Sequence, residues 1–322
     1  MKAMVLTAGY GTRLRPLTLE TAKPAIPVLG KPLIAQTLQK LASSGITHSR
    51  LNLHFLPQTI KQALESFQFG LPEISYSYET RILGTGGGLK SNESFFDDEN
   101  FLMVNGDIFF DFSIEPIIDF HIKNRAMATL ALYPQRQPYQ YTPIKIDSDC
   151  RIRSFPRSRP TKDDSEDSYV FTGVTVLSKD IFSLMKPNGF SDIISEAYEN
   201  AIALDQKIMG FPVTGYWNDL GTPSRYLCTQ KKLFRRYHWD PQIFVANDAI
   251  LGDGVRLGPY VSVGSGCSIG DHCHIEDSIL WDNCHVGSRS TIRRCILGRG
   301  VSIHGNYHDR IITTAHGESF ID

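Results

Sequence analysis

The sequence predicts an α/β domain with a mostly parallel sheet, followed by a β-solenoid. Up to about residue 235, short apolar runs alternate with longer segments that have apolar residues at helical spacing, which is typical of a parallel sheet covered by helices. From about Pro241, an apolar residue recurs every six positions, and a short constant period indicates stacked coils. The 322 residues allow two ordinary domains, which we place at residues 1–238 and 239–322.

The expected strands of the first domain come in a regular order along the chain. Between them, Pro32–Ser44 and Gln58–Phe67 have the helical pattern. Ligands of such sheets bind outside the carboxyl ends of the strands, so the residues after each strand are the candidates for a site. The expected strands are Met4–Leu6, Arg50–Leu53, Ile74–Tyr78, Phe101–Val104, Ala128–Leu132 and Phe171–Val176.

The first strand runs into a loop that contains Gly9 and Gly11, and the cations Arg13 and Lys23 follow soon after. Glycines let backbone N–H groups approach a ligand closely, and cations suit phosphate oxygens. The run therefore predicts a phosphate-binding loop. It is not a Walker A loop, because no G-x-x-x-x-G-K-[ST] is present. It is not a dinucleotide-binding turn either, since Leu14 stands where the third glycine is needed.

The second domain is predicted from its period. A meander of antiparallel strands would predict neither a constant six nor the glycine that follows the first four repeats, and the phase slips by one at Val286 and again at Leu297. We expect about three coils over Asp248–Ser302, with the residues from about His308 capping them or extending beyond them. Such coils cannot bury their faces alone, so we expect a homo-oligomer. The repeat positions are Leu251, Leu257, Val263, Ile269, Ile275 and Trp281.

The first loop resembles the signature of the sugar-1-phosphate nucleotidyltransferases, also called nucleotide-diphosphate-sugar pyrophosphorylases. Their pattern is Gly-x-Gly-Thr-Arg-x-x-Pro-Leu-Thr, then Lys-Pro, then Gly-Lys-Pro-Leu-Ile. This chain has it in Gly9–Thr18, Lys23–Pro24 and Gly30–Ile34. The second domain resembles the hexapeptide-repeat left-handed β-helix. The resemblance implies a Rossmann-like nucleotidyltransferase domain, transfer of a nucleotidyl group from a nucleoside triphosphate to a sugar 1-phosphate, and Mg²⁺ as the cofactor.

Two aspartates are the expected Mg²⁺ ligands. Asp107 follows the strand Phe101–Val104 in a run similar to the family's metal-binding segment, although Asn-Gly alone is also a hairpin signal. Asp219 precedes Thr222 and Pro223, which look like the N-cap and first residue of a helix, so an ordinary capping aspartate is the alternative. The pair suits Mg²⁺, which is held by one or two carboxylates plus substrate phosphates.

The resemblance also implies which residues bind the substrates. Arg13 and Lys23 would stabilise charge on the phosphates, and with Asp107 they are the expected catalytic residues. The glycine-rich run from Leu83 would lie against the nucleobase, with a flexible surface loop as the competing interpretation. The expected nucleotide-binding residues are Leu6, Ala8, Gly9, Gly11, Thr12, Leu83, Gly84, Thr85, Gly86 and Gly106, and the expected sugar-phosphate-binding residues are Thr172, Gly173 and Asn218.

The chain departs from the family at the sugar phosphate. Relatives commonly carry Glu-Lys-Pro, whose lysine holds that phosphate, whereas this chain has a different basic run after Phe155. Arg157, Arg159 and Lys162 are candidates, and none is assignable. The whole polar segment Ser154–Ser168 is expected to be an exposed loop.

The base and the sugar stay open. The LGTGG run and a β-helix occur together in mannose-1-phosphate guanylyltransferase-like members, which favours GTP with mannose or a related hexose or heptose phosphate. UTP- or dTTP-dependent transferases have similar loops. A catalytically silent sugar-nucleotide-binding regulatory subunit is a further alternative, against which the retained Arg13, Lys23, Asp107 and Asp219 argue. A hexapeptide acyltransferase would need more than three coils.

Composition and charge exclude other classes. Hydrophobic residues at 41%, charged residues at 21% and a net charge of −1 describe a globular protein without a nucleic-acid-binding surface. There is no membrane-span-length apolar run and no secretory signal, and six cysteines make no disulfide scaffold, so we expect a cytoplasmic protein. The cysteines and histidines between Cys267 and His285 lack C-x-x-C spacing, so no zinc site is expected. The expected partners are the nucleotide and the sugar phosphate, with neither nucleic acid nor membrane.

Overall fold

A computed structural model of the chain describes residues 1–67, 70–135, 141–156 and 168–321. The chain divides into two compact units, each discontinuous in sequence. Most of the predicted phosphate-binding loop therefore shares a unit with the C-terminal coils. The first unit comprises Met1–Gly9, Ile34–Pro57 and Glu65–Asp219, and the second comprises Tyr10–Leu33, Gln58–Leu64 and Leu220–Asp322.

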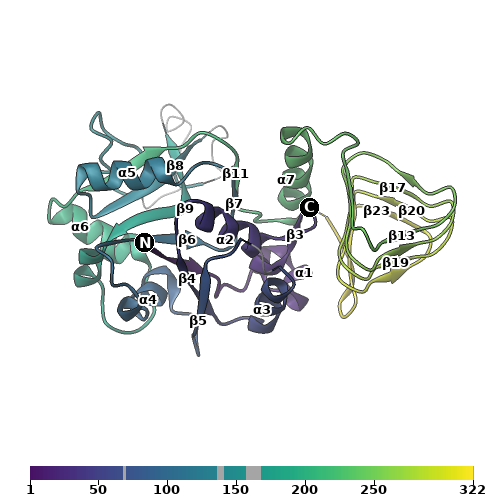
Figure 1. The fold of residues 1–322 in the computed structure, drawn as a ribbon, viewed down its shortest axis with the longest axis horizontal. Helices are drawn as coiled ribbons and strands as arrows, with labels where there is room; N and C mark the ends of the chain where they lie inside the picture. The colour runs from purple at the N-terminus through teal and green to yellow at the C-terminus, as the bar shows by residue number, and fades with distance from the viewer. Residues whose placement is uncertain (68–69, 136–140, 157–167, 322) are drawn as a thin grey trace. The chain divides into compact units, whose positions relative to one another are not determined.

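A seven-stranded sheet in the order β10-β8-β9-β6-β1-β4-β5 forms the first unit (Figure 1). Neighbouring strands are parallel except β9, which is antiparallel to both β6 and β8. All six expected strands are confirmed, and β10 was not predicted. The strands are β1 Lys2–Leu6, β4 His48–Leu53, β5 Glu73–Tyr78, β6 Asn100–Asn105, β8 Ala128–Pro134, β9 Tyr169–Ser178 and β10 Ile208–Pro212.

The composition of each strand follows from its place in the sheet. In the central strand β1, Ala3, Met4 and Val5 are fully buried, as a continuous apolar run should be in a strand covered on both faces. The edge strand β5 has the mixed sequence Glu-Ile-Ser-Tyr-Ser-Tyr and ends with Tyr78 60% exposed. The carboxyl ends of the central strands therefore start from a rigid, buried base.

The helices follow the sequence signals. α2 Leu33–Ser43 and α3 Pro57–Glu65 match the two helical patterns. Thr222 is the N-cap of α7 Pro223–Arg236, and its side-chain oxygen accepts a hydrogen bond from Arg225 N at 3.3 Å, which confirms the predicted cap. The remaining helices are α1 Leu17–Glu20, α4 Gly84–Lys90, α5 Glu115–Asn124 and α6 Glu199–Ala203, with 3₁₀ turns η1 Thr12–Leu14, η2 Lys23–Ala25, η3 Glu93–Phe95 and η5 Lys179–Leu184 and a π-turn η6 Ile194–Tyr198. None of the helices in the described ranges is long and apolar enough to cross a membrane.

Two short antiparallel pairs complete the elements outside the coils. β7 Phe109–Phe110 pairs with β11 Trp217–Asn218 in the first unit. β2 Pro27–Val28 pairs with β3 Lys31–Pro32 in the second unit. Neither pair was predicted, because two-residue strands carry no periodicity.

The C-terminal coils form a left-handed parallel β-helix with three sheets. Strands pair with equivalents one coil later, as Ile243 with Val261 and Ile279 with Ile296. Two of the sheets hold four parallel strands, so the coils exceed the three expected and run from Ile243 to Thr313. Their strands are β12 Ile243–Val245, β13 Ile250–Leu251, β14 Arg256–Leu257, β15 Val261–Val263, β16 Ser268–Ile269, β17 His274–Glu276, β18 Ile279–Leu280, β19 His285–Val286, β20 Thr291–Arg293, β21 Ile296–Leu297, β22 Ser302–Ile303 and β23 Asn306–His308.

The six-residue phase slips earlier than the sequence pattern suggested. Val263 pairs with Leu280 and Leu280 with Leu297, so Leu280 and not Trp281 occupies the repeat position. Trp281 is also buried, and its indole N–H donates to the Tyr226 hydroxyl of α7 at 3.2 Å. Two adjacent apolar residues are both buried here, and sequence alone does not tell which one continues the repeat.

The last residues cap the β-helix. β24 Arg310–Thr313 continues one sheet in parallel, and β25 Gly317–Phe320 turns back antiparallel to it. Of the two outcomes expected for the tail, capping is confirmed.

Candidate functional site

The carboxyl ends of β1 and β6 lie side by side in the first unit. Leu6 pairs with Asn105, and Gly106 N donates to Leu6 O at 2.8 Å. A Cβ on Gly106 would lie 2.6 Å from Thr7 Cγ2, so only glycine permits this approach. The predicted residues at this edge are Leu6, Ala8, Gly9, Gly106 and Asp107.

The pairing of β7 with β11 brings the two predicted carboxylates together along the backbone. Asn218 pairs with Phe109 in an antiparallel register. Asp219 directly follows β11 at Asn218, and Asp107 lies two residues before β7 begins at Phe109. Both aspartates are partly buried. The β7–β11 pairing therefore brings together the backbone segments that carry these two sequence-distant carboxylates.

Two of the predicted sugar-phosphate residues, Thr172 and Gly173, lie in β9, and the third, Asn218, lies in β11. Gly173 has φ +88°, and a Cβ there would lie 2.6 Å from Asn105 Nδ2. The Thr172 hydroxyl is fully buried and donates to Ala131 O at 2.9 Å. The carbonyl of Thr172 accepts from the Trp217 indole N–H at 2.7 Å. The Thr172 hydroxyl is therefore already bonded within the protein, so a ligand here would meet the backbone and Gly173.

The glycine-rich run forms the first turns of α4 and packs closely on its own chain. Gly86 N and Gly87 N both donate to Ser191 O, at 2.9 and 3.3 Å. The Thr85 hydroxyl accepts from Ile193 N at 2.9 Å. A Cβ on Gly86 would lie 2.3 Å from Ser191 Oγ. The glycines therefore serve close packing of a helix start, and the amides of Gly86 and Gly87 already have acceptors.

A buried chain of hydrogen bonds links the end of β1 to this run. Asn52 Oδ1 accepts from Thr7 N at 2.7 Å, and Asn52 Nδ2 donates to Glu79 Oε1 at 2.7 Å. Glu79 Oε2 accepts from Leu83 N at 2.9 Å. Neither Asn52 nor Glu79 is among the residues predicted from the sequence. The signal available was a polar side chain at the carboxyl end of each of two expected strands.

In the second unit, the rest of the predicted phosphate-binding loop makes a tight turn at Gly11. It has φ +61°, and a Cβ there would lie 3.0 Å from Thr18 Cγ2 and 3.1 Å from Lys23 Cβ. The Thr18 hydroxyl donates to Gly11 O at 2.8 Å. Lys23 is 5% exposed, whereas Arg13 and Thr12 are exposed. The signature thus supplies one buried and one exposed cation.

The β-helix and α7 support this loop within the same unit. The Tyr226 hydroxyl donates to Pro27 O. A Cβ on Gly30 would lie 2.1 Å from the Phe244 ring, which explains the glycine in the Gly-Lys-Pro part of the signature. Further hydrogen bonds join Leu29 to Gln230, and Glu20 to Thr314 and Ala315.

The donor set at Asp107 and Asp219 fits Mg²⁺, which prefers carboxylate oxygen and completes its shell with water and substrate phosphates. Among the described residues, no group of three or more His, Cys, Asp or Glu is placed to hold a metal ion. All six cysteines, each in a described segment, are free thiols. Cys267, Cys273 and Cys284 pack in the apolar core of the β-helix. Magnesium binding stays a prediction.

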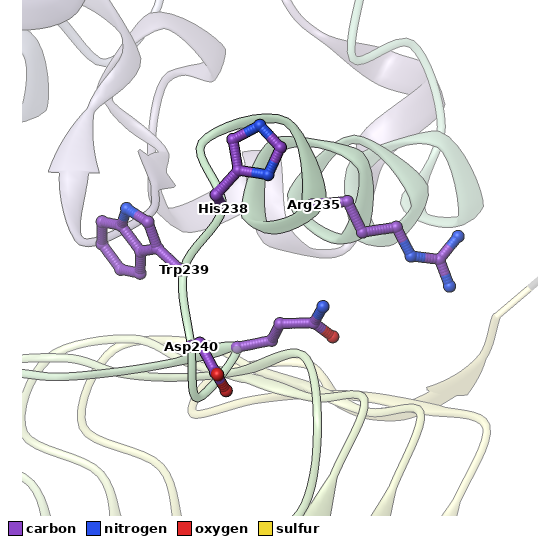
Figure 2. A pocket seen from close by; sticks show the side chains of 5 residues that line it. Arg235, His238, Trp239 and Asp240 are labelled. Carbon is purple, nitrogen blue, oxygen red and sulfur yellow. The ribbon is translucent and has the colours of Figure 1, made fainter.

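A shallow hollow of about 600 Å³ in the second unit contains none of the predicted residues. It lies where α7 leads into β12 (Figure 2). Its side chains carry both signs of charge and are mostly exposed, so they define no ligand chemistry. The lining residues are Arg235, His238, Trp239, Asp240 and Gln242.

The candidates for the sugar phosphate, Arg157, Arg159 and Lys162, lie outside the described residues, as does most of the expected loop Ser154–Ser168. The residue that replaces the usual lysine is therefore still unassigned.

Two family profiles match consecutive parts of the chain. The nucleotidyl transferase profile matches residues 2–236, and the GMPPB C-terminal domain profile matches residues 239–313. The first match alone covers more than half of the chain.

Curated relatives match at about 30% identity. The mannose-1-phosphate guanylyltransferase of Mycobacterium tuberculosis is 29% identical over 80% of this chain and 71% of its own length. The mannose-1-phosphate guanyltransferase of Yarrowia lipolytica is 31% identical over 70% of this chain and 62% of its own length. The mannose-1-phosphate guanylyltransferase catalytic subunit beta of Drosophila pseudoobscura pseudoobscura is 29% identical over 94% and 88%. Among solved structures, HddC from Yersinia pseudotuberculosis shares the fold, with a TM-score of 0.60, 20% identity, and coverage of 72% of this chain and 99% of its own.

Proposed function

Because the chain belongs to the nucleotidyl transferase family, we propose that it transfers the nucleotidyl group of a nucleoside triphosphate to a sugar 1-phosphate and releases pyrophosphate. GTP and mannose 1-phosphate are the proposed substrates, since the relatives named above are mannose-1-phosphate guanylyltransferases. The observation that supports the chemistry most is the pairing of β7 with β11, which brings the segments that carry Asp107 and Asp219 together, while Gly106 N bonds to Leu6 O at the end of β1.

The proposed reaction needs little covalent chemistry from the protein. An oxygen of the sugar phosphate attacks the α-phosphorus, and the bond from that phosphorus to the oxygen bridging to the β-phosphate breaks. Pyrophosphate leaves with the electron pair of that bond. Catalysis is then mostly positioning and charge neutralisation, which glycine-lined backbone, cations and paired carboxylates are suited to provide.

Each part of the chain has a proposed role in that reaction. Asp107 and Asp219 would hold Mg²⁺, which when bound would neutralise phosphate charge. Arg13 and Lys23 would neutralise charge on the α-phosphate and the leaving pyrophosphate. The backbone of Gly9–Thr12 would cradle the phosphates.

The base and the sugar would meet different segments. Leu83 and Gly84 would contact the base, because the amides of Gly86 and Gly87 are already bonded to Ser191. Gly173 and Asn218 would line the sugar site.

A pyrophosphate-release assay with four nucleoside triphosphates against several sugar 1-phosphates tests this function. We expect the highest kcat/KM for GTP with mannose 1-phosphate. A preference for UTP or dTTP would keep the reaction and overturn the substrates. Binding of a sugar nucleotide without turnover of any pair would overturn the reaction and favour a regulatory subunit.

A further inference from the structure

We propose that Asn52 and Glu79 are positioning residues for the nucleobase loop, defined here as Leu83–Gly88. They hold this loop in a set place relative to the nucleotide-binding end of β1. The inference rests on the proposed function, in which both segments bind the nucleotide, and it adds two side chains that touch neither the base nor the phosphates.

The pair crosses three neighbouring parallel strands. β4 lies between β1 and β5, and Asn52 is paired with Leu6 in the register of β1 with β4. Glu79 is the first residue after β5. The hydrogen bonds from Thr7 through Asn52 and Glu79 to Leu83 therefore connect the end of one strand to the nucleobase loop beyond the third.

Each polar side-chain atom of Asn52 and Glu79 has a complementary hydrogen-bond partner. Asn52 accepts from Thr7 N with its oxygen and donates to Glu79 with its nitrogen. Glu79 must accept twice, from Asn52 and from Leu83 N, and only a carboxylate offers two acceptors and no donor. Thr7, Asn52 and Glu79 are 1%, 2% and 7% exposed, so water does not readily replace a lost partner.

The backbone of α4 lies directly on the pair. A Cβ on Gly88 would lie 2.8 Å from Glu79 Oε1 and 3.0 Å from Asn52 Nδ2. The loop is thus held at its start by the Glu79–Leu83 hydrogen bond and near its end by close packing. A shift of about 1 Å in a positioning element costs about 100-fold in a reaction step, so loosening this pair should change how a base is bound.

Exchange of the two functional groups tests the proposal. Glu79→Gln leaves only one side-chain oxygen to accept from Asn52 Nδ2 and Leu83 N. Asn52→Asp places two carboxylates at hydrogen-bond distance, where they repel each other. The double variant Asn52→Asp/Glu79→Gln moves the amide to the other side of the same hydrogen bond, so every donor again has an acceptor. Thr129→Val on β8, which removes a buried hydrogen bond to His121 of α5, is the matched control for stability loss elsewhere in the sheet.

Nucleotide affinity is the main readout, with Kd measured calorimetrically for GTP, ATP, CTP and UTP in the presence of Mg²⁺. We expect each single variant to weaken GTP binding by about tenfold. The ratio of the Kd values for the other three nucleotides to that for GTP should become smaller. The KM for mannose 1-phosphate should stay within about twofold, and the double variant should recover GTP binding to within about threefold.

The outcomes separate this inference from the proposed function. Single variants that lose thermal stability but bind GTP as well as Thr129→Val does would overturn the inference. A double variant as impaired as the singles, in folding or in binding, would also overturn it. If the unchanged protein binds GTP but releases no pyrophosphate, the proposed function fails while the Kd values still decide the inference. If it binds no nucleotide, both fail.

Discussion

Asp107 is the single residue on which the proposed chemistry depends most. Asp107→Asn keeps the shape of the side chain but removes the charge that would hold Mg²⁺. We expect kcat for pyrophosphate release to fall by about 100-fold or more, with the thermal unfolding midpoint unchanged. Asp119→Asn, an exposed change on α5, is the control. Near-normal turnover of Asp107→Asn would refute the metal role.

His121 is a buried neutral imidazole, 1% exposed. Its Nε2 lies 3.0 Å from Asn100 Oδ1 and its Nδ1 lies 3.0 Å from Thr129 Oγ1. Because the amide oxygen only accepts, we assign the proton to Nε2, and the Thr129 hydroxyl then donates to Nδ1. Burial lowers the pKa of His121 to about 4.

This histidine makes stability depend on pH. Below its ordinary pKa of about 6.5 the unfolded chain takes up a proton that the folded protein does not, so stability is fully present above that pH. It should fall by about 3 kcal/mol as the pH drops from 6.5 to 4. Urea unfolding at several pH values should give a steeper loss for the unchanged protein than for His121→Gln, and parallel curves would contradict this.

At the residue scale, the motif residues were predictable and the positioning pair was not. Gly11, Arg13 and Lys23 stand within one continuous run. Asn52 and Glu79 acquire a role only through partners 45 and 27 positions away. Local patterns carry no information about which strands become neighbours.

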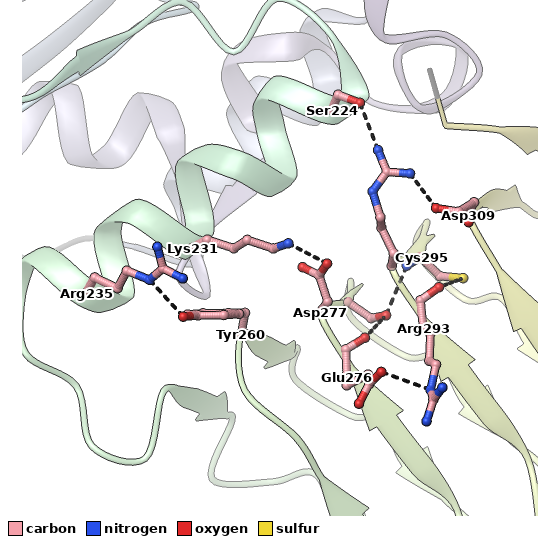
Figure 3. A network of polar contacts seen from close by, with 11 residues as sticks. Ser224, Lys231, Arg235, Tyr260, Glu276, Asp277, Arg293, Cys295 and Asp309 are labelled. Carbon is pink, nitrogen blue, oxygen red and sulfur yellow. Dashed lines mark hydrogen bonds and ion pairs between the residues drawn. The ribbon is translucent and has the colours of Figure 1, made fainter.

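The α7 helix shows how one element joins others within the second unit. Its side chains meet one corner of successive coils, where Tyr260, Asp277 and Arg294 have φ of +63°, +48° and +48° (Figure 3). Because these corner residues recur once per coil, a straight helix can contact several coils in turn. The pairs are Arg235 with Tyr260, Lys231 with Asp277, and Ser224 with Arg294.

Tyr226 on α7 is fully buried and connects this helix to the β-helix and to Pro27. Its hydroxyl accepts from the Trp281 indole and donates to Pro27 O. Tyr226→Phe removes both hydrogen bonds, one of which comes from the buried Trp281 indole, so the free energy of unfolding should fall by about 2 kcal/mol. Denaturant unfolding measures this, with Tyr237→Phe, where the side chain is 44% exposed, as the control. Equal values for the two variants would show that the Tyr226 hydroxyl adds no stability.

The start of α7 gives a second prediction for this element. Thr222→Ala removes the side-chain oxygen that accepts from Arg225 N, which should cost about 1 kcal/mol of stability. Thr222→Ser keeps a capping hydroxyl and should stay within a few tenths of the unchanged protein. Indistinguishable denaturation curves for the alanine and serine variants would rule out a stabilising cap.

At the element scale, long periodic segments were predictable and short or irregular ones were not. The six expected strands and the helices α2, α3 and α7 are present. The antiparallel direction of β9 depends on how the preceding segment connects it to β8, and the residues of β9 itself do not reveal it. The phase slip at Leu280 was hidden because Trp281 beside it is also buried.

For the whole molecule, the β-helix belongs to the same unit as most of the predicted phosphate-binding loop. Gly30 packs on Phe244, and Glu20 accepts from Ala315 N at 2.9 Å. A chain ending at residue 238 loses these partners, so we expect its thermal midpoint to fall by more than about 10 °C and its pyrophosphate release to be lost. A shortened chain with normal stability and turnover would show that the coils are dispensable.

The length of the β-helix bears on whether the protein could be a hexapeptide acyltransferase. An acyltransferase was disfavoured because only about three coils were expected, yet two sheets of the β-helix hold four parallel strands. The match of residues 2–236 to the nucleotidyl transferase family is instead what argues against an acyltransferase. The repeat predicted the kind of fold, but its C-terminal end was hidden because the coils shorten there, from the spacing of Ile243 and Val261 to the smaller spacing of Ile296 and Ile311.

The most direct test of the account follows the phosphates of GTP. The protein is incubated with mannose 1-phosphate, Mg²⁺ and GTP labelled on either the α- or the γ-phosphate. Nucleotidyl transfer predicts α-label in a sugar nucleotide and γ-label in pyrophosphate, with neither formed when mannose 1-phosphate is omitted. Label from the γ-phosphate on the sugar, or release of GMP or GDP without a sugar nucleotide, would contradict it.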